Sequence, residues 1–327
     1  MGTKLRLIGP LGKAVLAGCL HRVYRMSRQI STLIGVSALL LWSTLVGLLR
    51  LSTESFGPIY TVTYVYTISA IILFLTYGLP DLKKVSKKFL ILSSLLFVVF
   101  ELCFAFSITL ANSSEKSIEM NIIFNMWPTL IIIMLAVLKE EKVNLLTILG
   151  VIVSFAGIVV INYHPNLNFI DNFSKNPISY LLIFLAAILW AVYCIYTKKQ
   201  SNGTNAVSLY FILTAIALWI LTLSTQGFHL PHVQGINGYI FVLINAVFFS
   251  MGYLAWNIGI IKGNMPVLIM LSYFSPIFSS AFSAFVLNSN LTINFWYGAL
   301  TVTLGSLICW YSIRKNHVQH NQAKLAS

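Results

Sequence analysis

Charged residues are scarce in this chain of 327 residues. Only 9% of its residues are Asp, Glu, Lys or Arg, whereas 58% are hydrophobic. A soluble domain has no core large enough to hide so much apolar area, and it needs a more polar surface. The composition therefore excludes a soluble globular protein. It favours a bundle of helices in a lipid bilayer, because each helix satisfies its own backbone hydrogen bonds there.

Cysteine and histidine are also few, and their positions exclude the sites that these residues commonly build. The chain has 4 cysteines and no C-x-x-C motif, and Cys103, Cys194 and Cys309 fall in apolar runs. This pattern predicts neither a disulfide framework nor a zinc site. No histidine lies deep in an apolar run, and none forms a recognisable catalytic cluster with acidic residues. We therefore expect no metal, no other cofactor and no enzymatic activity.

Ten apolar runs follow one another along the chain, each close to the roughly 20 residues that a helix needs to cross a bilayer. Residues typical of loops separate them, such as Gly57-Pro58 and Asn202-Gly203. The sequence therefore predicts an all-α integral membrane protein with ten transmembrane helices. The predicted spans are 30–49, 58–77, 89–110, 118–138, 143–162, 178–197, 206–224, 238–260, 266–287 and 293–313.

The positive charge has an uneven distribution. A net charge of +13 would suggest nucleic acid as a partner for a soluble protein. If the N-terminus is cytoplasmic, however, all 21 Lys and Arg residues except Arg50, Lys116 and Lys175 lie on the cytoplasmic side. This is the bias of the positive-inside rule. We therefore expect both termini in the cytoplasm, the lipid bilayer as a partner and no bound nucleic acid.

Four pairs of landmark residues share one spacing of 148 positions, as from 42 to 190. The shared spacing predicts a duplicated chain with five helices in each half. Because five is odd, the second half must enter the membrane from the opposite side, which predicts inverted repeats with a substrate site between them. The pairs are Trp42 and Trp190, Pro128 and Pro276, Gly150 and Gly298, and Gly157 and Gly305.

The predicted division of the chain follows from these two patterns. Residues 1–29 form a basic cytoplasmic segment, in which Met26 is an alternative start to Met1 and a disordered tail is the other interpretation. The remaining divisions are a first five-helix repeat at 30–162, an extracytoplasmic linker at 163–177, a second five-helix repeat at 178–313 and a cytoplasmic tail at 314–327.

Glu101 is the acidic residue that lies deepest in a predicted span, about 18 Å along the third helix at 1.5 Å per residue. A carboxylate at that depth costs about 2.5–3.5 kcal/mol on insertion scales. It must therefore face the interior, be protonated or have a partner. Two interpretations stay open: a group that couples protons or anchors a substrate ammonium, and a hydrogen-bonded structural acid.

A proline interrupts the fourth and the ninth predicted helix at corresponding points. Pro128 follows Asn121 and Asn125 on one helix face, and Pro276 follows Tyr273. Each proline removes one backbone hydrogen bond and permits a kink. Paired kinks in two inverted halves point to the binding site. We expect Pro128 and Pro276 to act in gating, with a kink of no functional consequence as the alternative.

Aromatic and amide side chains share helix faces that lack the aliphatic residues typical of contact with lipid. The eighth span carries Tyr253, Trp256 and Asn257 at helical spacing, and the sixth carries Trp190 and Tyr193. These faces predict an aromatic-lined cavity for an aromatic solute with a polar head, or for a cation. Packing or a membrane-interface position is the alternative for any single tryptophan. The predicted substrate-binding residues are Trp42, Glu101, Asn125, Trp127, Trp190, Tyr193, Tyr253, Trp256, Asn257 and Tyr273.

Small residues line the fifth and the tenth span. Gly150, Ser154 and Gly157 lie on one face of the fifth, and Gly298 and Gly305 repeat the pattern on the tenth. Small residues let two helices approach closely. We therefore expect these five residues to serve helix packing, either between the halves or in a dimer, and we expect a monomer or a weak dimer.

Several motifs resemble the drug/metabolite transporter superfamily of EamA type, and within it the aromatic amino acid exporters. They are 41–50, 93–97 leading to Glu101, Trp127-Pro128, 255–260 with Gly263-Asn264, and 272–274 with Pro276. The resemblance implies a multi-pass protein of the bacterial inner membrane that exports Phe, Tyr, Trp or similar solutes. Asn125 departs from it, because such exporters tend to have an aromatic residue two positions before the Trp-Pro pair. This departure leaves the exact amino acid open.

The main hypothesis is alternating access for such solutes, driven by their own gradient or coupled to protons. An exporter of lipophilic cations is the first alternative, since it also fits Glu101 among aromatic residues. Export of other amino acids or metabolites is the second. A sugar-phosphate carrier is disfavoured because Arg50 and Lys262 lie only at helix ends. A channel is disfavoured because the sequence has no filter motif.

Overall fold

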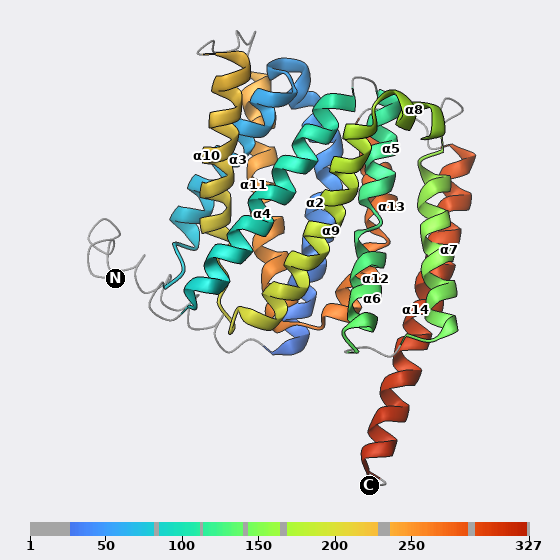
Figure 1. The fold of residues 1–327 in the computed structure, drawn as a ribbon. Helices are drawn as coiled ribbons and strands as arrows, with labels where there is room; N and C mark the ends of the chain where they lie inside the picture. The colour runs from blue at the N-terminus through green and yellow to red at the C-terminus, as the bar shows by residue number, and fades with distance from the viewer. Residues whose placement is uncertain are drawn as a thin grey trace.

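The computed structural model describes residues 27–81, 85–111, 114–139, 143–163, 169–227, 236–286 and 292–325, and every element within these ranges is a helix (Figure 1). The predictions for Met1 and Met26, and for linker residues 164–168, lie outside the described residues. The helices are α2 (Arg28–Phe56), α3 (Pro58–Thr76), α4 (Lys87–Ala111), α5 (Ser114–Phe124), α6 (Trp127–Val137), α7 (Leu145–Ile161), α8 (Phe169–Lys175), α9 (Pro177–Gln200), α10 (Val207–Gln226), α11 (Asn237–Lys262), α12 (Met265–Ser272), α13 (Ser275–Val286) and α14 (Ile293–Leu325).

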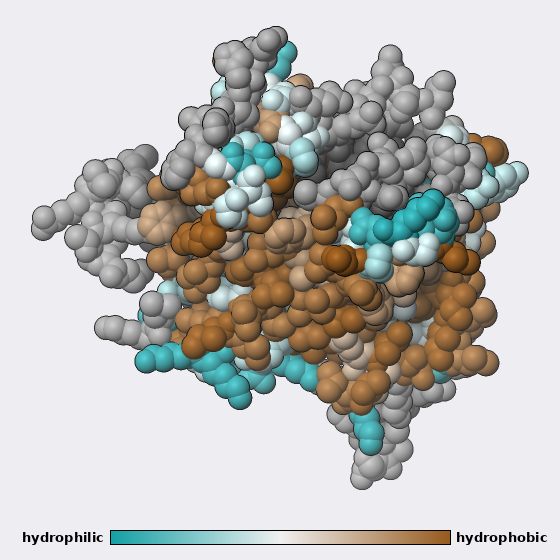
Figure 2. Space-filling view, turned by 45° about the horizontal axis from the view of Figure 1, so that its top comes forward, coloured by the Kyte–Doolittle hydropathy of each residue, from teal (hydrophilic) through white to brown (hydrophobic). Residues whose placement is uncertain are grey.

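The described helices are those of a membrane protein. Seven stretches are long and apolar enough to cross a bilayer, and α7 is a shorter apolar helix. Figure 2 shows a broad hydrophobic face whose hydrophilic residues gather toward its upper and lower edges. The prediction of an all-α membrane protein is therefore confirmed. The seven stretches are 58–76, 87–107, 119–137, 177–200, 207–226, 237–262 and 293–312.

Local sequence determines where several helices begin. The Ser27 hydroxyl accepts a hydrogen bond from the Ile30 amide at the start of α2, and the Asn144 side chain accepts one from the Thr147 amide at the start of α7. These side chains cap amide groups that have no partner within the helix. Between α2 and α3, Gly57 has φ of 73°, a conformation that glycine adopts without steric cost.

The fourth and the ninth predicted span are each broken into two helices just before the proline. The break between α5 and α6 contains a hydrogen bond of 3.0 Å from the Met126 amide to the Ile123 carbonyl, and the break between α12 and α13 contains one of 3.0 Å from the Phe274 amide to the Leu271 carbonyl. Each bond joins an amide to the carbonyl three residues earlier, as in a tight turn, and not four residues earlier as in an α-helix. They lie at positions related by the spacing of the two halves.

The two halves of the chain interleave along their lengths. The helix α2 packs against α11, α3 against α10, α4 against α9 and α7 against α14, so each pair takes one helix from each half (Figure 1). Two glycines let α2 and α11 approach each other closely. A Cβ atom added to Gly35 would lie 2.9 Å from the Cα of Gly259. The centre of the bundle is therefore built from both halves.

The small residues on α7 and α14 lie at the contact between these two helices. A Cβ atom on Gly150 would lie 2.8 Å from the carbonyl oxygen of Gly305, and one on Gly157 would lie 2.8 Å from that of Gly298. Ser154 adjoins Gly305 in the same contact. Glycine is required where a backbone carbonyl approaches this closely. Within this chain, the stripe joins the first half to the second.

Candidate functional site

Four of the predicted tryptophans form one cluster in the centre of the bundle. The ring centroids of Trp42 and Trp256 are 5.4 Å apart, those of Trp127 and Trp256 5.5 Å, and those of Trp42 and Trp190 6.0 Å. The rings come from α2, α6, α9 and α11, hence from both halves. The Tyr253 ring joins them at 5.0 Å from Trp42. These edge-to-face and tilted arrangements are favourable for aromatic pairs.

Two phenylalanines of α4 join this cluster, and they are not among the substrate-binding residues predicted from the sequence. Phe97 lies 5.3 Å from Tyr193 and 5.3 Å from Tyr253, and Phe100 lies 5.0 Å from Trp190, measured between ring centroids. Their spacing along α4 offered a clue, because Phe97, Phe100 and Glu101 recur on one helix face. We refer to Trp42, Phe97, Phe100, Trp127, Trp190, Tyr193, Tyr253 and Trp256 as the aromatic cluster.

Glu101 lies beside the aromatic cluster with a partner from the other half of the chain. The Tyr253 hydroxyl donates a hydrogen bond of 2.6 Å to its Oε1 atom, and the Glu101 side chain is only 6% exposed. A carboxyl group in the interior is stabilised by such a donor. Of the three alternatives for a carboxylate at this depth, two therefore hold for Glu101, because it faces the interior and it has a partner.

Asn257 ties two tyrosines of the aromatic cluster together. The Tyr193 hydroxyl donates to Oδ1 of Asn257 at 2.6 Å, and Nδ2 of Asn257 donates to the Tyr253 carbonyl at 2.9 Å. Next to them, the indole of Trp256 donates to Sγ of Cys194 at 3.5 Å. The amide of Asn257 is therefore engaged within the protein on both its oxygen and its nitrogen.

Asn125 and Tyr273 have their described contacts outside the aromatic cluster. The Asn125 side chain donates to the Asn121 carbonyl at 2.7 Å within its own turn. Its neighbour Phe124 instead stacks on Phe100, with ring centroids 5.9 Å apart. The Tyr273 hydroxyl bonds to Oγ1 of Thr129 at 2.8 Å, and its ring packs with side chains of α7 and α14. These two predicted residues border the site in this conformation and do not line its centre.

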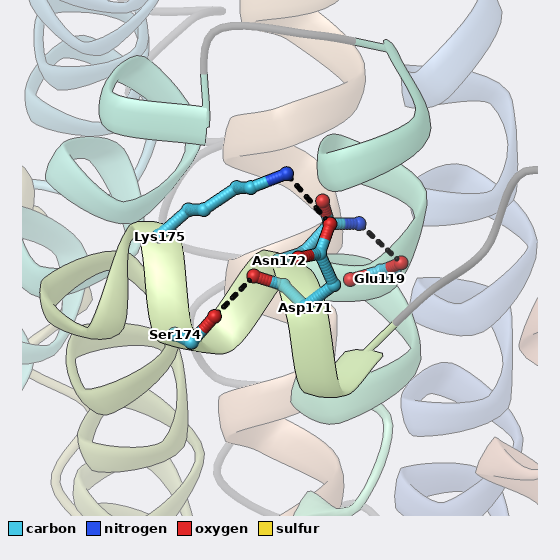
Figure 3. Close-up of polar contacts among 5 residues, drawn as sticks. All are labelled: Glu119, Asp171, Asn172, Ser174 and Lys175. Atoms are coloured by element: carbon cyan, nitrogen blue, oxygen red, sulfur yellow. Dashed lines mark hydrogen bonds and ion pairs between the residues drawn. The ribbon is translucent and has the colours of Figure 1, made fainter.

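A second buried carboxylate lies near one end of the bundle, and sequence reasoning missed it. Glu119 of α5 has no exposed surface and accepts a hydrogen bond of 2.9 Å from Nδ2 of Asn172 (Figure 3). It accepts a second one from the Tyr180 hydroxyl. Asn172 lies on α8, the short helix between the halves, and Tyr180 lies on α9. The position of Glu119 at the start of an apolar run was the available clue.

A helical bundle with an aromatic and acidic centre shared by two interleaved halves is the arrangement of a membrane transporter. The chain belongs to the EamA-like transporter family, which it matches twice, over residues 29–163 and 177–311. The family confirms the predicted resemblance and the prediction of a transporter in place of an enzyme.

Named relatives are similar over nearly the whole chain. The aromatic amino acid exporter YddG of Salmonella typhimurium is 37% identical over 298 residues, which is 89% of this chain and 100% of that protein. The YddG of Escherichia coli is 36% identical over 295 residues, again 89% of this chain and 100% of the relative. A solved crystal structure with 21% identity has a TM-score of 0.73 and covers 88% of this chain and 100% of its own. At that identity, the likeness shows the fold alone.

Proposed function

We propose that this protein exports aromatic amino acids, or related small amphipathic solutes, across the bacterial inner membrane by alternating access. The observation that carries the proposal is the aromatic cluster beside Glu101, which both halves of the chain build together. An aromatic surface of this kind favours an aromatic solute over a sugar or a phosphate. The exporter names of two relatives that are more than a third identical support the same solute class.

The proposed topology has ten spans in two inverted halves, with both termini in the cytoplasm. The two family matches, at 29–163 and 177–311, support a first repeat at 30–162 and a second at 178–313, joined by an extracytoplasmic linker. The matching breaks before Pro128 and Pro276 support a unit that occurs twice in the chain. Because the glycine stripe is used between α7 and α14, a single chain or a weak dimer suffices for transport.

In this mechanism, the aromatic ring of the substrate takes the place of contacts between rings of the aromatic cluster. Trp42 and Trp190 clasp the substrate ring, while Glu101 accepts a hydrogen bond from its ammonium group. The breaks before Pro128 and Pro276 let the helix halves tilt, because no continuous ladder of backbone hydrogen bonds resists them. The site then faces one side of the membrane at a time.

Counterflow of radiolabelled phenylalanine in proteoliposomes tests the proposal. We expect counterflow by the wild-type protein and a loss of about tenfold or more in Trp190→Ala, because an aromatic contact and its buried area are removed. Trp296→Ala is the control, since Trp296 is 60% exposed on the outer face of α14. The absence of phenylalanine counterflow by folded wild-type protein contradicts the proposal. Running the assay with and without a pH gradient decides whether protons are coupled.

Export of lipophilic cations is the second candidate function. Glu101 among tryptophan and tyrosine rings favours it, because both a carboxylate and aromatic faces attract a cation. Competition by tetraphenylphosphonium in the counterflow assay distinguishes the two candidates. Strong competition by this cation, together with weak counterflow of phenylalanine, supports the second.

A further inference from the structure

The two broken helices, one from each half of the chain, are joined by a hydrogen bond beside their breaks. The Tyr273 hydroxyl, directly after α12, shares a hydrogen bond of 2.8 Å with Oγ1 of Thr129. Thr129 follows Pro128 in the first turn of α6, and Tyr273 lies three residues before Pro276. The helices α6 and α12 also pack against each other (Figure 1). Each broken helix is therefore attached to the other at its break.

The Tyr273 end of this hydrogen bond is deeply buried. The Tyr273 side chain has no exposed surface, and its ring packs in a cluster with Ile158 of α7 and Val302 of α14. A buried hydroxyl that loses its hydrogen-bond partner costs free energy. The bond therefore favours arrangements of the two broken helices in which Thr129 and Tyr273 stay within reach of each other.

The first break also carries a ring of the aromatic cluster. The ring centroid of Trp127, the first residue of α6, lies 5.5 Å from that of Trp256 and 6.2 Å from that of Trp190. Thr129 follows two residues later, which is about 200° around a helix of 3.6 residues per turn. The start of α6 thus presents Trp127 to the aromatic cluster and Thr129 to the other broken helix. A displacement of Trp127 is carried to Tyr273 through half a turn of backbone.

The repeat does not supply this hydrogen bond a second time. At the spacing of 148 positions, Tyr273 corresponds to Asn125. Thr129 corresponds to Ile277. The Asn125 side chain donates to the Asn121 carbonyl at 2.7 Å, and the side chain of Ile277 has no polar group to offer it. The polar link between the breaks therefore depends on Thr129 and Tyr273 themselves, and not on a symmetric pair of bonds.

We propose that the hydrogen bond between Thr129 and Tyr273 couples the two proline breaks, so that a substrate ring against Trp127 makes both broken helices tilt together. This inference rests on the proposed alternating access and adds the contact that links its two hinges. Thr129 and Tyr273 are positioning residues, because they act through the broken helices and do not touch the substrate. They set the rate at which the loaded protein changes sides and leave its affinity for substrate unchanged.

Separate measurements of rate and affinity test this inference. The maximal rate of phenylalanine counterflow is measured in proteoliposomes, and the affinity for phenylalanine is measured in detergent. We expect Tyr273→Phe and Thr129→Val each to lower the maximal rate by about three- to tenfold, the range for one neutral hydrogen bond. The affinity should change by less than about twofold. Thr129→Ser keeps the hydroxyl and should retain most of the rate.

A double variant distinguishes one shared bond from two independent defects. Because both substitutions remove the same hydrogen bond, Thr129→Val combined with Tyr273→Phe should be no slower than the slower of the two single variants. A rate that falls by the product of the two single factors overturns the inference. So does an affinity that falls in parallel with the rate, because the two residues would then act in binding.

Thr63→Val is the matched control. The Thr63 hydroxyl shares a hydrogen bond of 2.7 Å with the Thr222 hydroxyl, which also joins the two halves but lies between the unbroken helices α3 and α10. Its loss should lower stability about as much as Thr129→Val does, whereas the maximal rate per folded molecule should stay within about twofold of the wild type.

Equal losses of rate in Thr63→Val and Thr129→Val, or an unchanged rate in Tyr273→Phe, overturn the inference while the proposed function stands. A folded wild-type protein without phenylalanine counterflow contradicts the proposed function itself. The same variants are then compared in counterflow of tetraphenylphosphonium, since the coupling concerns the helices and not the identity of the solute.

Discussion

Glu101 and Glu119, the buried carboxylates among the described residues, have different surroundings, although both accept a hydrogen bond from a tyrosine of the second half. Glu101 lies in the centre, beside the aromatic cluster, and accepts a hydrogen bond from Tyr253. Glu119 lies where α5, α8 and α9 meet, and it receives hydrogen bonds from Asn172 (Figure 3) and from Tyr180. One acid lies beside a cluster of aromatic rings, and the other joins three helices.

This difference teaches that burial alone does not identify a functional acid. The hydrogen bonds of Glu119 are made within the protein, so it is suited to holding the helix between the halves against α5. Glu101 is suited to an external ligand because it lies beside aromatic rings that both halves of the chain supply. The comparison predicts a transport defect at one acid and a stability defect at the other.

The largest expected effect is at the central acid. Glu101→Gln should lower phenylalanine counterflow by about 10- to 100-fold, because the amide keeps the size of the side chain but loses the charge that receives the ammonium. The unfolding temperature should change by no more than about 2 °C, since the amide oxygen still accepts from Tyr253. Counterflow at the wild-type rate contradicts the role of Glu101 in binding.

The second-largest expected effect is on the stability of the folded protein. Glu119→Ala should lower the free energy of unfolding by about 1–3 kcal/mol, because the Asn172 and Tyr180 donors stay behind without an acceptor. Thermal unfolding in detergent measures this change. The control is Asp171→Ala, whose carboxylate is 48% exposed and pairs with Lys175 on its own helix. It should change stability by less than about 0.5 kcal/mol. Equal losses of stability in Glu119→Ala and Asp171→Ala would contradict the structural role of Glu119.

The third effect separates the tyrosines that serve the two acids. Tyr253→Phe should reduce counterflow by about three- to tenfold, since Glu101 loses the donor that orients it. Tyr180→Phe should leave the counterflow rate per folded molecule within about twofold while it destabilises the protein by about 1 kcal/mol. Initial rates normalised to folded protein, together with unfolding curves, check both. The opposite pattern would mean that Glu119 is the functional acid.

The smallest expected effect is a difference in stability between two asparagine variants. Asn172→Ala should cost about 1 kcal/mol of stability, because its amide joins α8 to Glu119 on another helix. Asn162→Ala should cost less, about 0.5 kcal/mol, because that amide donates to the Ile158 carbonyl in its own turn. Parallel unfolding measurements resolve the difference. Equal values indicate that the attachment of α8 contributes nothing to stability.

Properties that depend on neighbours along the chain were determined by the sequence alone. The helical runs, the duplication and the breaks before Pro128 and Pro276 follow from hydropathy, one repeated spacing and a missing amide hydrogen. The family also follows from the sequence, because its motifs are local. The tryptophans of the aromatic cluster were predictable to the same extent, since each lies on a helix face that lipid would not favour.

Only the tertiary structure decided which faces meet. Phe97 and Phe100 enter the aromatic cluster because of how α4 is rotated about its axis, and hydropathy does not record that rotation. Tyr273 lies against α7 and α14, although its position shortly before Pro276 predicted a place at the centre of the site. Glu119 finds its donors on α8 and α9, 53 and 61 positions away. Such contacts depend on the crossing of helices far apart in the chain, which is set by side-chain packing across both halves.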